Sequence, residues 1–151
     1  MRLPFLSPRL ELLTPDGRLV PVDAGSDPGW GPRRVVLARE LCSFELFSPG
    51  VGGRRGLEAV RLHARLAAPY AQPGWLVEPS GEAFGIWWWD AAKVGPWLAG
   101  RFGTRPPPLT PESLARPPGD GWRVLRTSTG FEAQAWRQGA LVASSWSRAA
   151  F

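Results

Sequence analysis

The sequence has very few of the side chains that metal sites, disulfide frameworks and nucleophile–base pairs require. Its 151 residues include one cysteine, Cys42, and one histidine, His63. A single cysteine excludes an internal disulfide and any site with several cysteine ligands, and its apolar surroundings favour a buried, unreactive thiol. His63 falls within a predicted helix and has no second histidine or cysteine near it in the sequence, which favours a structural imidazole over a metal ligand.

The chain also lacks long apolar runs and clustered basic residues. No apolar run approaches the roughly 20 residues that span a bilayer, and the first residues, MRLPFLSPRLELL, contain two prolines and Glu11, unlike a signal peptide. We therefore expect a cytoplasmic chain without a membrane span. Lys93 is the only lysine among 18 basic residues, and the net charge is +5. Because the arginines occur singly or in pairs without a recognised motif, nucleic acid is an unfavoured partner.

What the chain has in abundance is tryptophan, with nine in total and three in succession at positions 87–89. The uncharged segment Ala83–Trp89 would be apolar on both faces of a strand, which is typical of a strand at the centre of a sheet. Asp90 follows, and its carboxylate is suited to cap a helix that begins at Ala91. Alternation sends Trp88 to the opposite face from its two neighbours, so at least Trp88 is expected in the core. A carbohydrate-binding module stays open as an alternative use of the tryptophans.

The remaining segments predict one further helix and several strands. Residues 55–68 have helical periodicity, with Leu57, Val60 and Ala64 on the face expected to meet the sheet. Asp16-Gly17 predicts a hairpin turn within 9–22, and the glycine-rich turn at 48–53 matches no phosphate-binding fingerprint. Gly95-Pro96 is expected to break or kink the helix that follows Asp90. Strands are expected at 35–37, 41–47, 75–78, 122–127, 131–136 and 141–146, the last three as a meander.

Together these segments predict a mixed α/β domain of the α+β type, with a largely antiparallel sheet and one or two packed helices. The domain would cover residues 1–151. It would contain a helix–strand core unit at 33–104, a stiff proline-rich connector at 105–120 rather than a packed element, and a β-meander at 121–151.

A search for catalytic residues finds no constellation in the sequence. No serine lies in a G-x-S-x-G motif, and the 13 acidic residues offer no carboxylate pair that can be assigned as acid and base. We therefore predict no catalytic residue, no cofactor and no metal ligand.

Four segments, in this order, carry a resemblance to a known family: RRVVLARELCSFELFSP, LEAVRLHARLAAPY, WWWDAAKV and GWRVLRTSTGFEAQAWRQGALVASSW. From Arg33 onward the chain resembles the cytoplasmic, actin-like domain of the L-type inner-membrane platform protein of type II secretion and its type IV pilus counterparts. The resemblance implies an RNase H/actin-like half followed by the meander. It also implies a non-catalytic scaffold at the inner face of the bacterial inner membrane, which engages the assembly ATPase or other platform components.

In the actin-like superfamily the nucleotide lies between two hairpin loops, and the resemblance assigns these loops to Leu13–Leu19 and Thr127–Phe131. Asp16 fits the first loop, but the second has no aspartate, so the chain departs from the pattern that ATP hydrolysis requires. A degenerate ATPase stays open. The family continues into a transmembrane helix and a periplasmic domain, whereas this chain stops at Phe151. It is therefore a piece of such a protein, a stand-alone relative, or unrelated to it.

A scaffold also needs a contact surface, and the meander is the predicted place. Its final strand is expected at a sheet edge, and alternation places Trp136 on one face with Glu132 and Gln134. Strand edges pair readily with other chains, and tryptophan is enriched at interface hot spots. We predict that Trp136, Trp146, Glu132 and Gln134 mediate homodimerisation or partner docking. The alternative is that both tryptophans pack on each other or beneath the proline-rich segment.

The rival functional class is a nucleic-acid-binding domain that uses arginine and tryptophan contacts.

Overall fold

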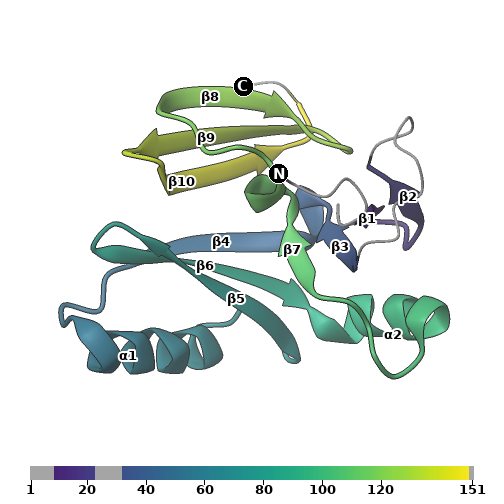
Figure 1. The fold of residues 1–151 in the computed structure, drawn as a ribbon, viewed down its shortest axis with the longest axis horizontal. Helices are drawn as coiled ribbons and strands as arrows, with labels where there is room; N and C mark the ends of the chain where they lie inside the picture. Colours follow the sequence, from purple (N-terminus) through teal and green to yellow (C-terminus); the bar gives the residue numbers. More distant parts are fainter. Residues whose placement is uncertain (1–8, 23–31, 150–151) are drawn as a thin grey trace, which may run out of the picture.

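The computed structural model describes residues 9–22 and 32–149, in which three small sheets and two α-helices form a layered body (Figure 1). The first sheet has the order β2 (Leu19–Pro21), β1 (Arg9–Leu13), β3 (Arg33–Leu37), β7 (Leu109–Pro111). The second has the order β4 (Cys42–Phe47), β6 (Ala83–Asp90), β5 (Pro73–Ser80), and the third β10 (Ala140–Ser147), β9 (Phe131–Arg137), β8 (Gly121–Arg126). The helices are α1 (Gly53–Leu66) and α2 (Ala91–Phe102), with 3₁₀ turns η2 (Arg39–Leu41) and η3 (Glu112–Ala115).

The predicted fold class is confirmed, and the sheets are mostly antiparallel as expected. The exceptions are the parallel pairs β1–β3 and β3–β7. Residues 1–8 and 23–31 lie outside the described part of the chain.

The β6 strand is central in its sheet, as its apolar sequence predicts. It pairs with β4 on one side and β5 on the other. On one face, Ile86 and Trp88 pack against α1; on the other, Trp87 and Trp89 belong to the larger core shared with the other sheets. Both faces are therefore covered, α1 lying below the sheet and the meander above it in Figure 1.

The α1 helix presents the predicted face to the sheet, although its ends differ by about two residues from the expected ones. Val60 and Ala64 are fully buried, whereas Leu57 is half-buried. The indole of Trp88 donates a hydrogen bond of 2.7 Å to the carbonyl of Ala64, one of the last carbonyls of the helix. Such carbonyls have no partner within the helix, so this bond fixes the helix end to the sheet.

Two further local predictions hold. The Asp90 carboxylate accepts a hydrogen bond of 3.0 Å from the backbone N–H of Ala92 and caps α2. Gly17 has a φ of +84° in the β1–β2 turn, and a side chain there would collide with the ring of Trp97. The prediction that Gly95-Pro96 breaks or kinks the following helix is settled in one respect: α2 continues through Pro96, so the helix is not broken there. Within the described residues, neither helix is long and apolar enough to cross a bilayer.

The proline-rich connector is a correction to the prediction. Residues 109–111 form β7, which pairs in parallel with β3, and η3 follows directly. Pro111, Glu112 and Ser113 are buried. Proline is tolerated in β7 because the strand lies at the edge of its sheet, where one side needs no backbone donor. The segment is therefore a packed element that joins the first sheet to the meander.

The meander forms as predicted from three antiparallel strands. Its β9–β10 turn contains Gln138 and Gly139, both with positive φ, as a two-residue hairpin turn requires. β10 lies against β4 and β5, so the meander is packed on the central sheet.

The burial of Val60 yields a direct test of the helix–sheet packing. Val60→Asp should lower the free energy of unfolding by about 3 kcal/mol or more, because it places an unpaired carboxylate between α1 and the sheet. Leu62→Asp is the matched control, since Leu62 lies on the same helix but faces solvent; it should change stability by about 0.5 kcal/mol or less. Urea denaturation measures both, and equal effects would contradict the assigned face.

Candidate functional site

The polar side chains that converge in this structure do so around a buried arginine at the junction of the three sheets. Arg39 lies in η2, between β3 and β4, and its side chain is only 6% exposed. Its Nε lies 3.0 Å from Oε1 of Glu132 on β9, which is 1% exposed. Its Nη1 donates to the carbonyl of Cys42 at 2.6 Å, and its Nη2 donates to the hydroxyl of Ser144 at 2.9 Å. The guanidinium also lies over the ring of Trp87, 5.2 Å from its centroid.

Glu132 is satisfied on both oxygens. The hydroxyls of Ser113 and Ser144 donate to its Oε1, and the amide of Gln134 donates to its Oε2 at 2.9 Å. A separate carboxylate, Glu112, accepts a bond of 2.9 Å from the backbone N–H of Arg39. The network therefore joins η2, η3, β4, β9 and β10. Its charged side chains, Arg39 and Glu132, form an ion pair with each other.

The network continues outward along the inner face of the meander. The Oε1 of Gln134 accepts bonds from Nε of Arg123, at 2.7 Å, and from the indole of Trp136, at 2.8 Å. The guanidinium of Arg123 lies 4.9 Å from the ring centroid of Trp136. These contacts occupy the polar atoms that a ligand would otherwise use.

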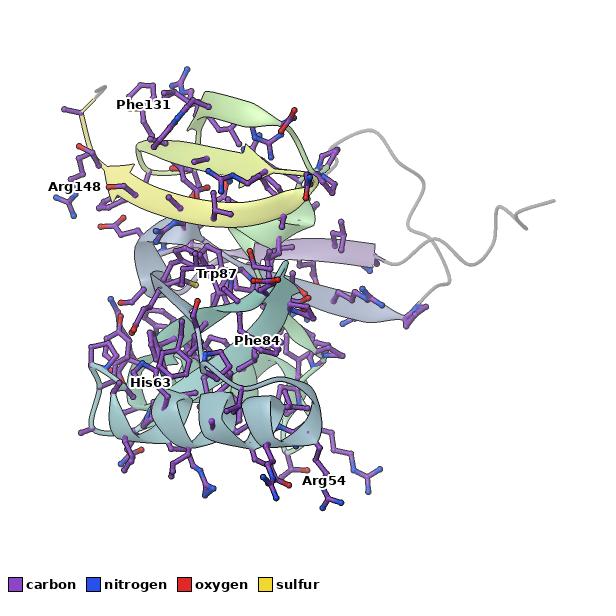
Figure 2. All side chains as sticks on the ribbon, turned by 90° about the vertical axis from the view of Figure 1, so that its left-hand side faces the viewer. Arg54, His63, Phe84, Trp87, Phe131 and Arg148 are labelled. Carbon is purple, nitrogen blue, oxygen red and sulfur yellow. The ribbon has the colours of Figure 1, made fainter. Side chains whose placement is uncertain are left out.

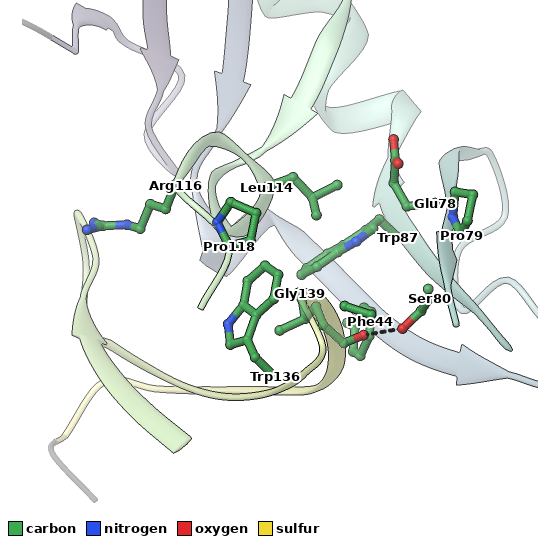
Figure 3. Close-up of a pocket in the computed structure, with 13 residues that line it drawn as sticks. Phe44, Glu78, Pro79, Ser80, Trp87, Leu114, Arg116, Pro118, Trp136 and Gly139 are labelled. Atoms are coloured by element: carbon green, nitrogen blue, oxygen red, sulfur yellow. Dashed lines mark hydrogen bonds between the residues drawn. The ribbon is translucent and has the colours of Figure 1, made fainter. Parts of the chain in front are cut away.

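Beside Trp136 lies a small cleft of about 190 Å³ between the meander and the central sheet (Figure 3). Trp87, Trp136, Phe44 and Leu114 line it, and the Ser80 hydroxyl at its margin is bonded to the carbonyl of Leu141 at 2.8 Å. In Figure 3 the Arg116 side chain points away from the cleft. The cleft is thus mainly aromatic and aliphatic. Glu78 and Arg116 are the charged residues that line it, and the Ser80 hydroxyl donates to the Leu141 carbonyl rather than to a carboxylate.

The single cysteine and the single histidine both have contacts typical of structural residues. Burial raises the pKa of the Cys42 thiol to about 12, so the thiol is protonated and unreactive at neutral pH. The His63 ring stacks on Phe47 with centroids 3.9 Å apart, and its Nε2 lies 3.0 Å from Glu45. Figure 2 shows His63 on the side of α1, well away from Trp87. Within residues 9–22 and 32–149, no three histidine, cysteine or acidic side chains form a metal-binding cluster.

The resemblance assigns the turns at 13–19 and 127–131 to phosphate-binding loops. In each turn, polar side chains form hydrogen bonds within the turn or with adjacent residues. Thr14 and Arg18 donate hydrogen bonds to the Asp16 carboxylate, and the bond from Thr14 is the main reason that the pKa of Asp16 lies below its ordinary value. The second turn is closed by Thr127, whose hydroxyl accepts bonds from the backbone of Gly130 and the indole of Trp146.

The predicted interaction residues of the meander require a correction. Glu132, Gln134 and Trp136 share one face as expected, but that face is the inner one, and all three are buried. Trp146 is half-buried against Thr127. The error has a physical cause: alternation identifies which residues share a face, but it cannot tell which face meets the core. Trp136 lies beside the cleft that Pro118 also lines, close to the alternative that placed it beneath the proline-rich segment.

The sequence prediction missed the surface residues that the structure exposes instead. Trp122 and Val124 on β8 are 79% and 57% exposed, and Leu62 and Leu66 on α1 are 53% and 77% exposed. The alternation of Trp122, Val124 and Arg126 against Arg123 and Leu125 was visible in the sequence as a signal. The charged core residue Arg39 was also visible, between two apolar segments, but its partner Glu132 is 93 residues away.

The buried ion pair yields a second test. Arg39→Met should cost about 3–5 kcal/mol of unfolding free energy, because it leaves the Glu132 carboxylate buried without its cation. The double variant Arg39→Met/Glu132→Leu should cost clearly less than the sum of the two single variants, since no charge is then stranded. Denaturant unfolding of the four proteins closes the cycle, and strictly additive effects would contradict the coupling.

No family model matches the chain, and no curated protein is significantly similar to it in sequence. What the protein does must therefore be inferred from its own residues and contacts.

Proposed function

We propose that the chain is a non-catalytic scaffold module of a bacterial secretion or pilus assembly platform, at the cytoplasmic face of the inner membrane. One observation carries the proposal: the polar groups of the Arg39 network bind one another, whereas large apolar side chains are exposed on two opposite layers. Arg39, Glu132 and Gln134 have partners within the fold and leave no converging polar groups for a substrate. The likeness of four segments to the cytoplasmic domain of the L-type platform protein supplies the class of assembly.

The two exposed patches lie on layers that face away from each other. Leu62 and Leu66 are on α1, the lowest layer in Figure 1, and Trp122 and Val124 are on β8, in the uppermost layer. Large contiguous patches of exposed apolar side chains mark sites of contact with proteins or membranes. With a patch on each outer layer, one body can hold two partners at once. The proposed partners are the assembly ATPase, other inner-membrane platform components, and a second copy of the chain.

Binding to platform proteins tests this proposal. The purified chain should bind the assembly ATPase or an inner-membrane platform protein of the same bacterium in a calorimetric titration. Leu66→Glu should weaken a contact made through α1 by about tenfold or more, since it places a charge in the apolar patch. Val22→Glu is the control, because Val22 is also exposed but lies beside β2. Failure to bind any of these proteins would contradict the assembly role.

Nucleotide binding tests the non-catalytic part of the proposal. A degenerate actin-like ATPase would bind Mg-ATP and use the Asp16 carboxylate as a metal ligand, although Thr14 and Arg18 hold that carboxylate. We expect no stoichiometric Mg-ATP binding and no phosphate release. Stoichiometric binding with turnover that Asp16→Asn abolishes would replace the scaffold with an enzyme.

A nucleic-acid-binding domain is the second candidate, and one specific observation favours it. Trp122 is exposed, and exposed Arg126 follows on the same face of β8, so a base could stack beside a bound phosphate. This function predicts affinity for a single-stranded oligonucleotide that falls steeply with salt, because each neutralised phosphate releases counterions. Trp122→Ala should then weaken binding by about 1–3 kcal/mol. Undetectable binding at low salt would remove this candidate.

A further inference from the structure

The free edge of β8 has no proline and no register shift, and one side chain, that of Arg116, bonds a backbone carbonyl there. The strand is hydrogen-bonded to β9 alone and ends the order of its sheet. Charged side chains protect edges of this kind, and β8 carries Arg123 and Arg126, but proteins also use proline, bulges or cover from other elements. Those devices occur on the other edges: Pro21 in β2, Pro73 and Pro79 in β5, Pro111 in β7, a register shift at Leu141/Ala143 in β10, and β10 itself beside β4.

The alternation of hydrogen-bonded and non-bonded pairs between β8 and β9 determines which backbone groups of β8 point to its free edge. The N–H of Thr127 donates to the carbonyl of Gly130 at the hairpin turn. In an antiparallel pair, hydrogen-bonded and non-bonded positions alternate, so Leu125 and Arg123 also face β9. The intervening residues of β8 are Trp122, Val124 and Arg126. Their backbone N–H and C=O groups therefore point to the free edge. In agreement, Arg126 accepts a bond from the exposed guanidinium of Arg116 at its carbonyl.

The side chains of the same three residues lie together on the solvent face of the meander. Trp122, Val124 and Arg126 are exposed, whereas Arg123 and Leu125 turn toward the interior. The neighbouring strand places alanines opposite two of them, Ala135 beside Trp122 and Ala133 beside Val124, and Phe131 opposite Arg126. The edge thus carries an aromatic ring, an aliphatic side chain and a cation in a row.

We propose that β8 pairs antiparallel with β8 of a second copy of this chain, about a two-fold axis at Val124. In that register the two Val124 residues face each other, and Trp122 of each copy faces Arg126 of the other. Each cation then lies beside an exposed indole, a contact worth about 0.5–1 kcal/mol at a surface. The two meanders form one continuous sheet, and the Trp122 N–H of one copy replaces Arg116 at the Arg126 carbonyl of the other.

Charge and side-chain direction select this arrangement over others. A parallel arrangement would place the two Arg126 cations side by side, and opposed like charges destabilise a strand pair. A shift by one residue would turn the side chains of one copy to the other face. An acidic peptide could pair with Arg126 but would offer no cation to Trp122. A second copy of the chain supplies partners for both residues and therefore fits the row better than a foreign strand does.

The size of the contact sets its expected strength. Three outward-facing residues from each copy form a smaller interface than the roughly 1,200–2,000 Å² of stable complexes, so we expect a dissociation constant of about micromolar or weaker. The contact shares the Trp122 and Val124 patch with the scaffold proposal, but it needs neither α1 nor a platform protein and therefore does not rest on the assembly role.

A concentration series in sedimentation equilibrium tests the pairing on the full chain. The parent should dimerise reversibly, and Val124→Lys should weaken the association constant by about tenfold or more, because two cations then face each other on the axis. Trp122→Ala should weaken it as well. Leu62→Lys is the matched control, an exposed leucine on α1, and should leave the association constant unchanged. Circular dichroism confirms that each variant is folded.

Cysteine cross-linking tests the register. Facing positions of a hydrogen-bonded antiparallel pair have Cα atoms about 5.5 Å apart, within disulfide range. Val124→Cys should therefore form a covalent dimer under mild oxidation, whereas Arg126→Cys should not, because its own mate lies about 13 Å away along the paired strands. Native Cys42 is buried and does not interfere.

A parent that stays monomeric up to about millimolar concentration, together with a Val124→Cys variant that does not cross-link, would overturn the proposal. Equal cross-linking at positions 124 and 126 would overturn the register. Oligonucleotide binding that Trp122→Ala abolishes, in a protein that stays monomeric, would assign the surface to nucleic acid instead. Each result is independent of whether the chain binds an assembly ATPase, so the two proposals can fail separately.

Discussion

The structure depends on one buried ion pair, between Arg39 of η2 and Glu132 of β9. Removing two charges from water costs several kcal/mol per ion, and their attraction compensates only when further hydrogen bonds complete both groups. Here the hydroxyls of Ser113 and Ser144 and the amide of Gln134 complete them. The partners come from both sides of the junction between the meander and the other sheets. We infer that the pair fixes how these layers are oriented, because apolar side chains alone tolerate several packings.

The position of this network also decides which face of the meander is available. Glu132, Gln134 and Trp136 turn inward to reach Arg39 and Arg123, so alternation turns Trp122 and Val124 to solvent. An inner face with so many polar groups would be costly unless every group had a partner. The polar groups of the inner face have their partners within the fold, and the outer face exposes Trp122 and Val124. The surface that we propose for interaction therefore lies on the opposite side of the meander from the predicted one.

The local elements could be predicted because their causes are local. The uncharged strand before Asp90, the cap at Asp90 and the Asp16-Gly17 turn each follow from side chains within a few residues of one another. The helical face around Val60 follows from a 3.6-residue period. The packed role of residues 109–115 did not follow, because its stabilisation comes from pairing with β3, far away in the sequence. Proline content alone indicated a connector.

The sequence by itself determined which residues lie on the same face of each strand and helix, because backbone geometry fixes those periods. It did not determine which face of the meander is the inner one. The contact between Arg39 and Glu132, which are 93 residues apart in the sequence, determines that choice, because it places the face of the meander that carries Glu132 in the interior. Only the tertiary structure contains this contact, since a buried charge is stable only beside its counter-charge and the sequence does not record which charges meet.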